Sequence, residues 1–152
     1  MPPAVKRRVL FICIGNACRS PMAEAVARQL ASDVIEPSSA GLSPLGRLAK
    51  ATEQTLIDNG YSIEGLCSKP LRCDAMENID LIINMSGQSF DGFFGNGNAM
   101  DDSRHSPNVE DWDVEDPYGG NPAIYRRILV ELESRVLLLA SRIRTGQRAV
   151  NT

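Results

Sequence analysis

The stretch VLFICIGNACRSP, which runs from Val9 to Pro21, decides the fold because it places a strand, a tight loop and a helix start in series. Its apolar run, 9–12, is typical of a buried strand, and the loop that follows contains Gly15. Ser20 is a favoured helix N-cap, and Pro21 is the residue expected at the first helical position. Such a series gathers backbone N–H groups and the positive end of a helix dipole, which predicts an anion-binding site.

A cysteine at the entrance of this loop adds reactivity to the predicted anion site. A thiol beside a helix N-terminus and an arginine ionises more readily than a free thiol, and the thiolate is the nucleophilic form. Arg19, six residues after Cys13, can place two hydrogen bonds on the oxygens of a phosphate. Attack of sulfur on phosphorus would give a cysteinyl-phosphate whose transition state the loop amides stabilise. The alternative is a buried cysteine with a chance arginine nearby.

The composition describes a soluble globular chain. Its 152 residues are 43% hydrophobic and 23% charged, which predicts one domain with a full core. No uncharged apolar stretch approaches the ~18 residues of a membrane span. The net charge of −3 argues against general nucleic-acid binding. The basic residues 6–8 precede a short strand rather than a signal peptide, so we expect a cytoplasmic protein.

The cysteine spacing argues against a metal site. The four cysteines are Cys13, Cys18, Cys67 and Cys73, and no secretory signal precedes them. This pattern indicates reactive thiols in a reducing compartment. A zinc site would need paired short spacings such as C-x2-C, whereas the intervals here contain four and five residues. We therefore expect no metal and no cofactor.

Alternating apolar runs and helical patterns predict an α/β fold with a parallel sheet. The predicted strands are 7–12, 34–39 and 80–85, and the predicted helices are 20–32, 48–59, 71–79 and 121–143. Gly60 should end the second helix. Segment 86–105 is predicted to be a loop, with His105 as a solvated residue. Residues 7–144 should form the ordered core, and the tail 145–152 should fray.

Departure of a leaving group needs a proton, and the candidate donor is Asp116 in the sequence EDPY. Pro117 stiffens the turn that would present this carboxyl group. Five acids lie within 110–116, and like-charge repulsion from the other four should raise the pKa of Asp116. We therefore predict an acidic pH optimum. The alternative is an ordinary turn in a solvated acidic loop.

The sequence CIGNACRSPMAE, from Cys13 to Glu24, resembles the signature loop of the low-molecular-weight protein tyrosine phosphatase family. The similarity extends from about Arg8 to Arg144. It implies a single-domain (1–152) three-layer sandwich, with a central four-stranded parallel sheet flanked by helices and the phosphate-binding loop after the first strand. It also implies a metal-independent phosphatase acting on phosphotyrosine in proteins. Phosphorylated proteins or peptides would be its substrates, phosphate and other oxyanions would compete, and the chain would be a monomer or weak dimer without nucleic-acid or membrane partners.

The same resemblance assigns catalytic roles. Cys13 would be the nucleophile, Arg19 the phosphate binder, and Asp116 the general acid and later the base. Asn16 and Ser20 would order the loop and support the thiol. The phosphate-binding residues would be Ile14, Gly15, Asn16, Ala17, Cys18, Arg19 and Ser20.

Three further residues carry supporting roles by resemblance. Tyr118 would form a wall of the substrate pocket. Ser39 would hydrogen-bond the phosphate loop. Cys18 could close a disulfide with Cys13 and protect it from irreversible oxidation. The alternative for Cys18 is a small buried apolar residue.

Departures from the family pattern leave the leaving group open. Ala17 stands where tyrosine-directed members usually carry a branched aliphatic residue and arginine-directed members carry threonine. Segment 42–47 lacks the aromatic residue often found there. The pair Gly119-Gly120 is similar to the sequence at this place in a bacterial subgroup that includes protein arginine phosphatases. Dephosphorylation of phosphoarginine is therefore the alternative to dephosphorylation of phosphotyrosine.

Two other functions remain as rivals. Thiol-dependent arsenate reduction would need two further cysteines just after the central strand, where 86–94 has none. A non-catalytic phosphate-binding module would bind phosphate without turnover.

Overall fold

The computed structural model of the chain describes residues 6–72, 78–88 and 108–150. In chain order, its elements are β1 (Arg7–Cys13), α1 (Arg19–Leu30), β2 (Ile35–Gly41), α2 (Lys50–Asp58), β3 (Leu81–Asn84), β4 (Asn108–Asp111) and α3 (Pro122–Val150). The three predicted strands and the three longer predicted helices are all present, with shifted ends. The short helix predicted at 71–79 falls largely on residues 73–77, which lie outside the described residues. The predicted loop 86–105, which contains His105, falls largely on residues 89–107, which also lie outside them.

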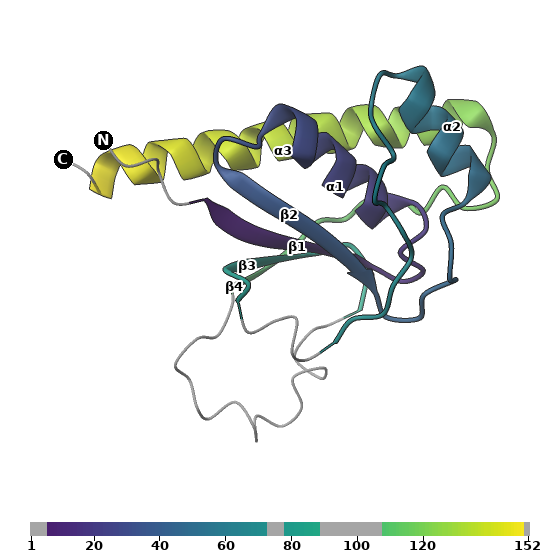
Figure 1. Cartoon of the computed structure of the whole chain (residues 1–152), viewed down its shortest axis with the longest axis horizontal. Coiled ribbons are helices and arrows are strands. Elements are labelled where there is room, and N and C mark those ends of the chain that lie inside the picture. Colours follow the sequence, from purple (N-terminus) through teal and green to yellow (C-terminus); the bar gives the residue numbers. More distant parts are fainter. Residues whose placement is uncertain (1–5, 73–77, 89–107, 151–152) are drawn as a thin grey trace.

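The four strands form one parallel sheet in the order β2-β1-β3-β4, which confirms the predicted α/β fold (Figure 1). In this register Cys13 lies opposite Gly41, and Asn84 lies opposite Asp111. The carboxyl ends of all four strands therefore meet at one edge. The loops that leave this edge are where an α/β fold builds its site.

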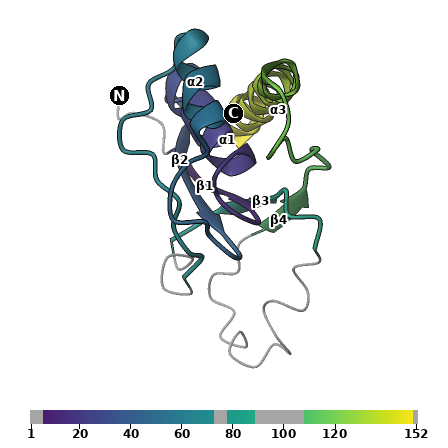
Figure 2. The ribbon, with the colours of Figure 1, turned by 90° about the vertical axis from the view of Figure 1, so that its right-hand side faces the viewer.

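Helices cover one face of the sheet, with α1 and α3 packed against each other (Figures 1 and 2). Alternate residues of a strand point to opposite faces, and β1 follows this rule. Val9 and Phe11 enter the large core beneath the helices, whereas Leu10 and Ile12 enter a smaller core on the other face. No helix in the described ranges is long and apolar enough to cross a bilayer.

The edge strand β4 was missed by the sequence analysis. Its sequence NVED has one apolar residue, and three of its four residues are exposed. Nothing in such a segment shows the period of a strand. It forms because β3 offers an unpaired edge, to which β4 adds in parallel.

The start of α1 and the end of α3 also differ from the prediction. α1 begins at Arg19, so Ser20 is not its N-cap and Pro21 is not its first residue. The reason is that the Ser20 hydroxyl bonds within the phosphate loop. α3 continues to Val150, where a frayed tail was expected from 145. Arg144 forms an ion pair with Asp33 near this end, and 147–149 are good helix formers.

Candidate active site

In the loop between β1 and α1, 14–18, the carbonyl oxygens of Ile14, Gly15 and Ala17 face the segment after β2. They and the carbonyl of Cys13 accept hydrogen bonds from the segment after β2: Leu42 N to Cys13 O, Ser43 N to Ile14 O, Leu45 N to Gly15 O, and Ala49 N to Ala17 O, at 2.8–3.2 Å. No N–H group of 14–18 donates to another atom in the described part of the chain. These donors are therefore available to an anion, as the sequence predicts.

Asn16 holds the loop in shape. Its φ of 48° lies in the left-handed region, which asparagine tolerates better than most residues. Its Nδ2 donates to Ser20 Oγ (2.8 Å), and its Oδ1 accepts from the N–H of Lys69 (2.8 Å). Behind it the backbone of Gly41 comes so close that a Cβ there would lie 2.7 Å from the oxygen of Ile14. The end of β2 therefore packs directly against the loop.

Cys13 is buried, and its sulfur lies 3.0 Å from Ser20 Oγ. Since Ser20 Oγ already accepts a hydrogen bond from Asn16, its own hydrogen is free to point at the sulfur. A donated hydrogen bond stabilises negative charge on its acceptor. The loop thus presents a thiol in the setting that a nucleophile requires.

Arg19 is buried, and one edge of its guanidinium is fixed. Its Nη1 donates to the carbonyls of Met85 (2.6 Å) and Val114 (3.1 Å), after β3 and β4. Its Nε is fully buried and has no partner among the described residues. An unpaired buried donor costs about 1–3 kcal/mol, so its presence indicates a missing acceptor. Nε and Nη2 form the fork that binds an oxyanion bidentately.

Asp116 lies at the other side of Arg19. Its Oδ2 is 3.6 Å from Arg19 Nη2, and its side chain is half exposed. Its Oδ1 accepts a hydrogen bond from the N–H of Tyr118 (3.1 Å), whose ring is exposed. A carboxyl group in this position reaches both the arginine and solvent. The structure thus brings Arg19 and Asp116 together. The catalytic roles of Cys13, Arg19 and Asp116 stay predictions.

Two of the four neighbouring acids are paired with arginines, so they contribute less of the like-charge repulsion on which an acidic pH optimum would depend. Glu110 forms two hydrogen bonds with Arg142 (2.7 and 3.1 Å), and this guanidinium lowers the pKa of Glu110. Glu115 pairs with Arg127 at 2.6 Å. Asp116 itself has the guanidinium of Arg19 3.6 Å from its Oδ2. The pH optimum stays a prediction.

The hydroxyl of Ser39 does not reach the phosphate loop, which corrects the predicted contact. It donates to Glu24 Oε1 of α1 (2.5 Å) and lies 3.5 Å from Lys69 Nζ, with no bond to a loop atom among the described residues. The reason is its register: Ser39 pairs with Phe11, whose side chain enters the core beneath the helices. Ser39 therefore supports α1, and Gly41 is the β2 residue that touches the loop.

Cys18 is buried on the helix side of the loop. Its sulfur lies 3.5 Å from the hydroxyl of Tyr125 on α3, and burial raises the pKa of its thiol. Cys13 and Cys18 are both free thiols in the structure. The thiol form of Cys18 suits a packing role as well as a protective one.

The segment 67–71 supports the loop and was missed as such by the sequence analysis. Ser68 Oγ donates to the carbonyl of Gly15 (2.9 Å), and Lys69 donates its N–H to Asn16. Gly41 exchanges backbone hydrogen bonds with Lys69 and Leu71. Two of these four contacts join main-chain atoms only, and such contacts leave no signal in a sequence.

No group of three or more metal-binding side chains occurs within 6–72, 78–88 and 108–150. A cavity of about 360 Å³ borders Arg19. It is lined by Arg19, Asn84, Met85, Gly87, Gln88, Asp111, Trp112, Asp113 and Val114.

The geometry agrees with what comparison with known proteins finds. The model of the low molecular weight phosphotyrosine protein phosphatase family matches residues 8–149. The chain belongs to this family. Membership supports a cysteine-based phosphatase that needs no metal and binds phosphorylated substrates and phosphate.

Relatives within the family carry different substrate names. The protein-arginine-phosphatase of Bacillus subtilis (strain 168) is 30% identical over 92% of this chain and 99% of its own length. The low molecular weight protein-tyrosine-phosphatase YfkJ of the same organism is 35% identical over 72% of this chain and 80% of its own. A solved arsenate reductase in the phosphate binding state is 28% identical with a TM-score of 0.73, covering 90% of this chain and 98% of that one. These names leave the substrate unresolved.

Proposed function

We propose that the protein is a cytoplasmic, single-domain protein tyrosine phosphatase working through a cysteinyl-phosphate. The observation that carries this proposal is the buried, unpaired Nε of Arg19, at the end of the same loop that begins at the buried Cys13. A buried arginine with one edge fixed and the other unsatisfied is a binding site for a tetrahedral oxyanion. A thiol at the same site adds a nucleophile.

The proposed reaction has two steps. The thiolate of Cys13 attacks phosphorus, and the bond from phosphorus to the leaving oxygen breaks as Asp116 gives that oxygen a proton. The loop N–H groups and Arg19 stabilise the charge on the equatorial oxygens. Asp116, now ionised, takes a proton from a water that attacks phosphorus and releases phosphate. The thiolate of Cys13 is regenerated.

Supporting residues complete the proposal. The hydrogen bond from Ser20, held by Asn16, would stabilise the thiolate between turnovers. The exposed ring of Tyr118 would stack on the phosphotyrosine ring. Cys18 would capture an oxidised Cys13 as a disulfide, in a monomer or weak dimer.

A protein arginine phosphatase is the second candidate. It is supported by similarity to the Bacillus subtilis arginine phosphatase along nearly the whole of both chains. The chemistry would be the same, with the P–N bond breaking and Asp116 protonating the guanidinium nitrogen. Arsenate reduction is less favoured, because no cysteine follows Cys73 in the chain.

The test is phosphate release from matched phosphotyrosine and phosphoarginine peptides in EDTA, with Cys13→Ser as the inactive control. We expect turnover of phosphotyrosine with the metal chelated, and none by the variant. Preference for phosphoarginine would transfer the assignment to the second candidate. Phosphate binding without turnover of either peptide would refute a phosphatase.

A further inference from the structure

Two cations beside the phosphate loop have no partner that the structure describes. Arg47 and Lys50 are exposed, and neither makes a hydrogen bond or ion pair within the described ranges. Within the same ranges the side chains of the exposed Arg7 and Arg126 are also unpaired, but three further surface arginines are paired. Arg127, Arg142 and Arg144 contact Glu115, Glu110 and Asp33. The two unpaired cations beside the phosphate loop are therefore free to meet an anionic partner.

The segment that carries them is fixed to the phosphate loop at two points. At one end the N–H of Leu45 donates to the carbonyl of Gly15 (3.1 Å). At the other, the N–H of Ala49 and the hydroxyl of Thr52 both donate to the carbonyl of Ala17 (3.2 and 2.7 Å). Gly15 and Ala17 are two residues apart in the proposed cradle. Segment 45–52 is thus a fixed rim of the site.

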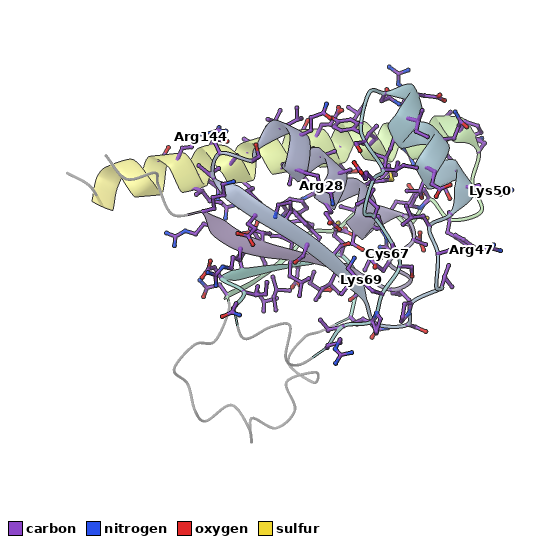
Figure 3. The ribbon with its side chains drawn as sticks, in the orientation of Figure 1. Arg28, Arg47, Lys50, Cys67, Lys69 and Arg144 are labelled. Atoms are coloured by element: carbon purple, nitrogen blue, oxygen red, sulfur yellow. The ribbon has the colours of Figure 1, made fainter. Side chains whose placement is uncertain are left out.

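The side chains of this rim differ in their burial. Leu48 is buried and anchors the segment, whereas Leu45, Arg47 and Lys50 are exposed. Figure 3 shows Arg47 and Lys50 at the same end of the molecule, beside the start of α2. Glu53, one turn further along α2, forms no ion pair with either within the described structure.

Charge is segregated across the mouth of the site. Asp113 and Asp116 are exposed on the segment after β4, and the rim 45–52 supplies two positive charges after β2. A peptide with acidic residues next to its phosphorylated residue would be repelled by one side and attracted by the other. The arrangement therefore orients such a peptide as well as binding it.

We propose that Arg47 and Lys50 form a cationic rim that selects substrate segments with Asp or Glu near the phosphorylated residue. This inference rests on the proposed phosphatase function and names its substrate class. An extended peptide advances about 3.3 Å per residue, so residues two or three positions from the phosphorylated one lie about 7–10 Å from it. The rim is hydrogen-bonded to the phosphate loop, so it lies next to the position that the phosphorylated residue would occupy. Because each exposed ion pair contributes roughly threefold and the two factors multiply, two give about tenfold.

The test compares two phosphopeptides that differ only in four flanking residues, Asp in one and Asn in the other. The quantity measured is the ratio of their kcat/KM values. For the wild type we expect a ratio of about 10, falling towards 1 in about 0.5 M salt because exposed charges are screened. In Arg47→Glu/Lys50→Glu we expect a ratio of 1 or less. Turnover of a small aryl phosphate, which has no flanking residues, should change less than about twofold.

A matched control carries the same charge change at the opposite end of β1. Lys6 and Arg7 lie at its amino end, away from the loop, and Lys6→Glu/Arg7→Glu should keep the wild-type ratio. A wild-type ratio near 1, or an equal loss in both double variants, would overturn the proposal.

Failure of the proposed function would look different. In that case neither the aryl phosphate nor any peptide would be turned over. Binding of the same two peptides to Cys13→Ser, followed by fluorescence anisotropy, then measures the preference directly. Tighter binding of the acidic peptide, lost when Arg47→Glu/Lys50→Glu is added, supports the rim; equal binding of both peptides overturns it.

Discussion

The phosphate loop and the acid loop, which meet at the mouth of the site, differ in how far they are buried. In the phosphate loop, Asn16, Ala17 and Cys18 are buried, and the loop carbonyls are bonded to the segment after β2. In the acid loop, 112–118, buried Trp112 and Val114 alternate with exposed acids. The difference follows from chemistry. A nucleophile and an anion cradle need fixed geometry, whereas a proton donor must reach both the leaving group and water.

Replacing Arg19 should give the largest effect, because it removes the buried fork. Arg19→Lys loses Nε and Nη2 and cannot bind an oxyanion bidentately. We expect kcat to fall about 10³-fold, the loss typical of removing donors that stabilise a transition state. Steady-state kinetics with an aryl phosphate measures it. Arg127→Lys, an exposed paired arginine facing the acid loop, is the matched control and should stay within about twofold. A loss under tenfold in Arg19→Lys would contradict the assigned role.

Replacing Asp116 tests whether an exposed side chain can matter as much as a buried one. Asp116→Asn cannot give up a proton, so kcat/KM, which reports the step in which the leaving group departs, should fall about 10²-fold for a poor leaving group. The loss in kcat/KM should be much smaller for a nitrophenolate, which leaves without protonation. The slope of log kcat/KM against leaving-group pKa checks this. Asp113→Asn, exposed on the same loop, should keep the wild-type slope; an equal change in both variants would remove Asp116 from its role.

The acid loop is also where sequence reasoning worked least well. The apolar run at 9–12 predicted a central strand of the sheet, because those residues act through local pattern and burial. The phosphate site predicted for the loop after it stays a prediction. The strand β4 and the partners of Glu110 depend on contacts with residues about 30 positions away. The partner of Ser39 depended on strand register, which the sequence did not reveal.

Removing Asn16 should produce an intermediate effect on both activity and stability. Asn16→Ala deletes the bonds to Ser20 and Lys69 and leaves an alanine at φ 48°. We expect kcat to fall about tenfold or more through misplacement of the thiol, with about 1–3 kcal/mol lost from the free energy of unfolding. Asn59→Ala removes one bond at the end of α2 and should lower stability alone. If both variants lose activity in proportion to stability, Asn16 is merely structural.

The smallest effect should come from the ion pair at the base of the acid loop. Glu110 accepts hydrogen bonds from Arg142 and from Trp112 Nε1, and Arg142 holds the pKa of Glu110 below its ordinary value. The folded state therefore binds fewer protons than the unfolded chain near that pKa. The contribution of the Glu110–Arg142 pair to the free energy of unfolding is complete above the unfolded pKa of glutamate, about 4.3. It is lost as the pH falls through the lower pKa that Glu110 has in the folded state.

Glu110→Gln should thus lower the free energy of unfolding by about 0.5–1 kcal/mol at pH 7, since the pair is partly exposed. The difference from wild type should shrink towards zero as the pH falls below about 4. Urea unfolding at a series of pH values measures both numbers, and Arg142→Gln should give the same pH dependence because it removes the other half of the pair. A difference that stays constant down to pH ~3 would show that packing, not charge, holds this end of the acid loop. The activity of both variants at pH 7 should remain within about twofold of wild type, because the pair lies at the edge of the sheet and contacts neither Arg19 nor Asp116.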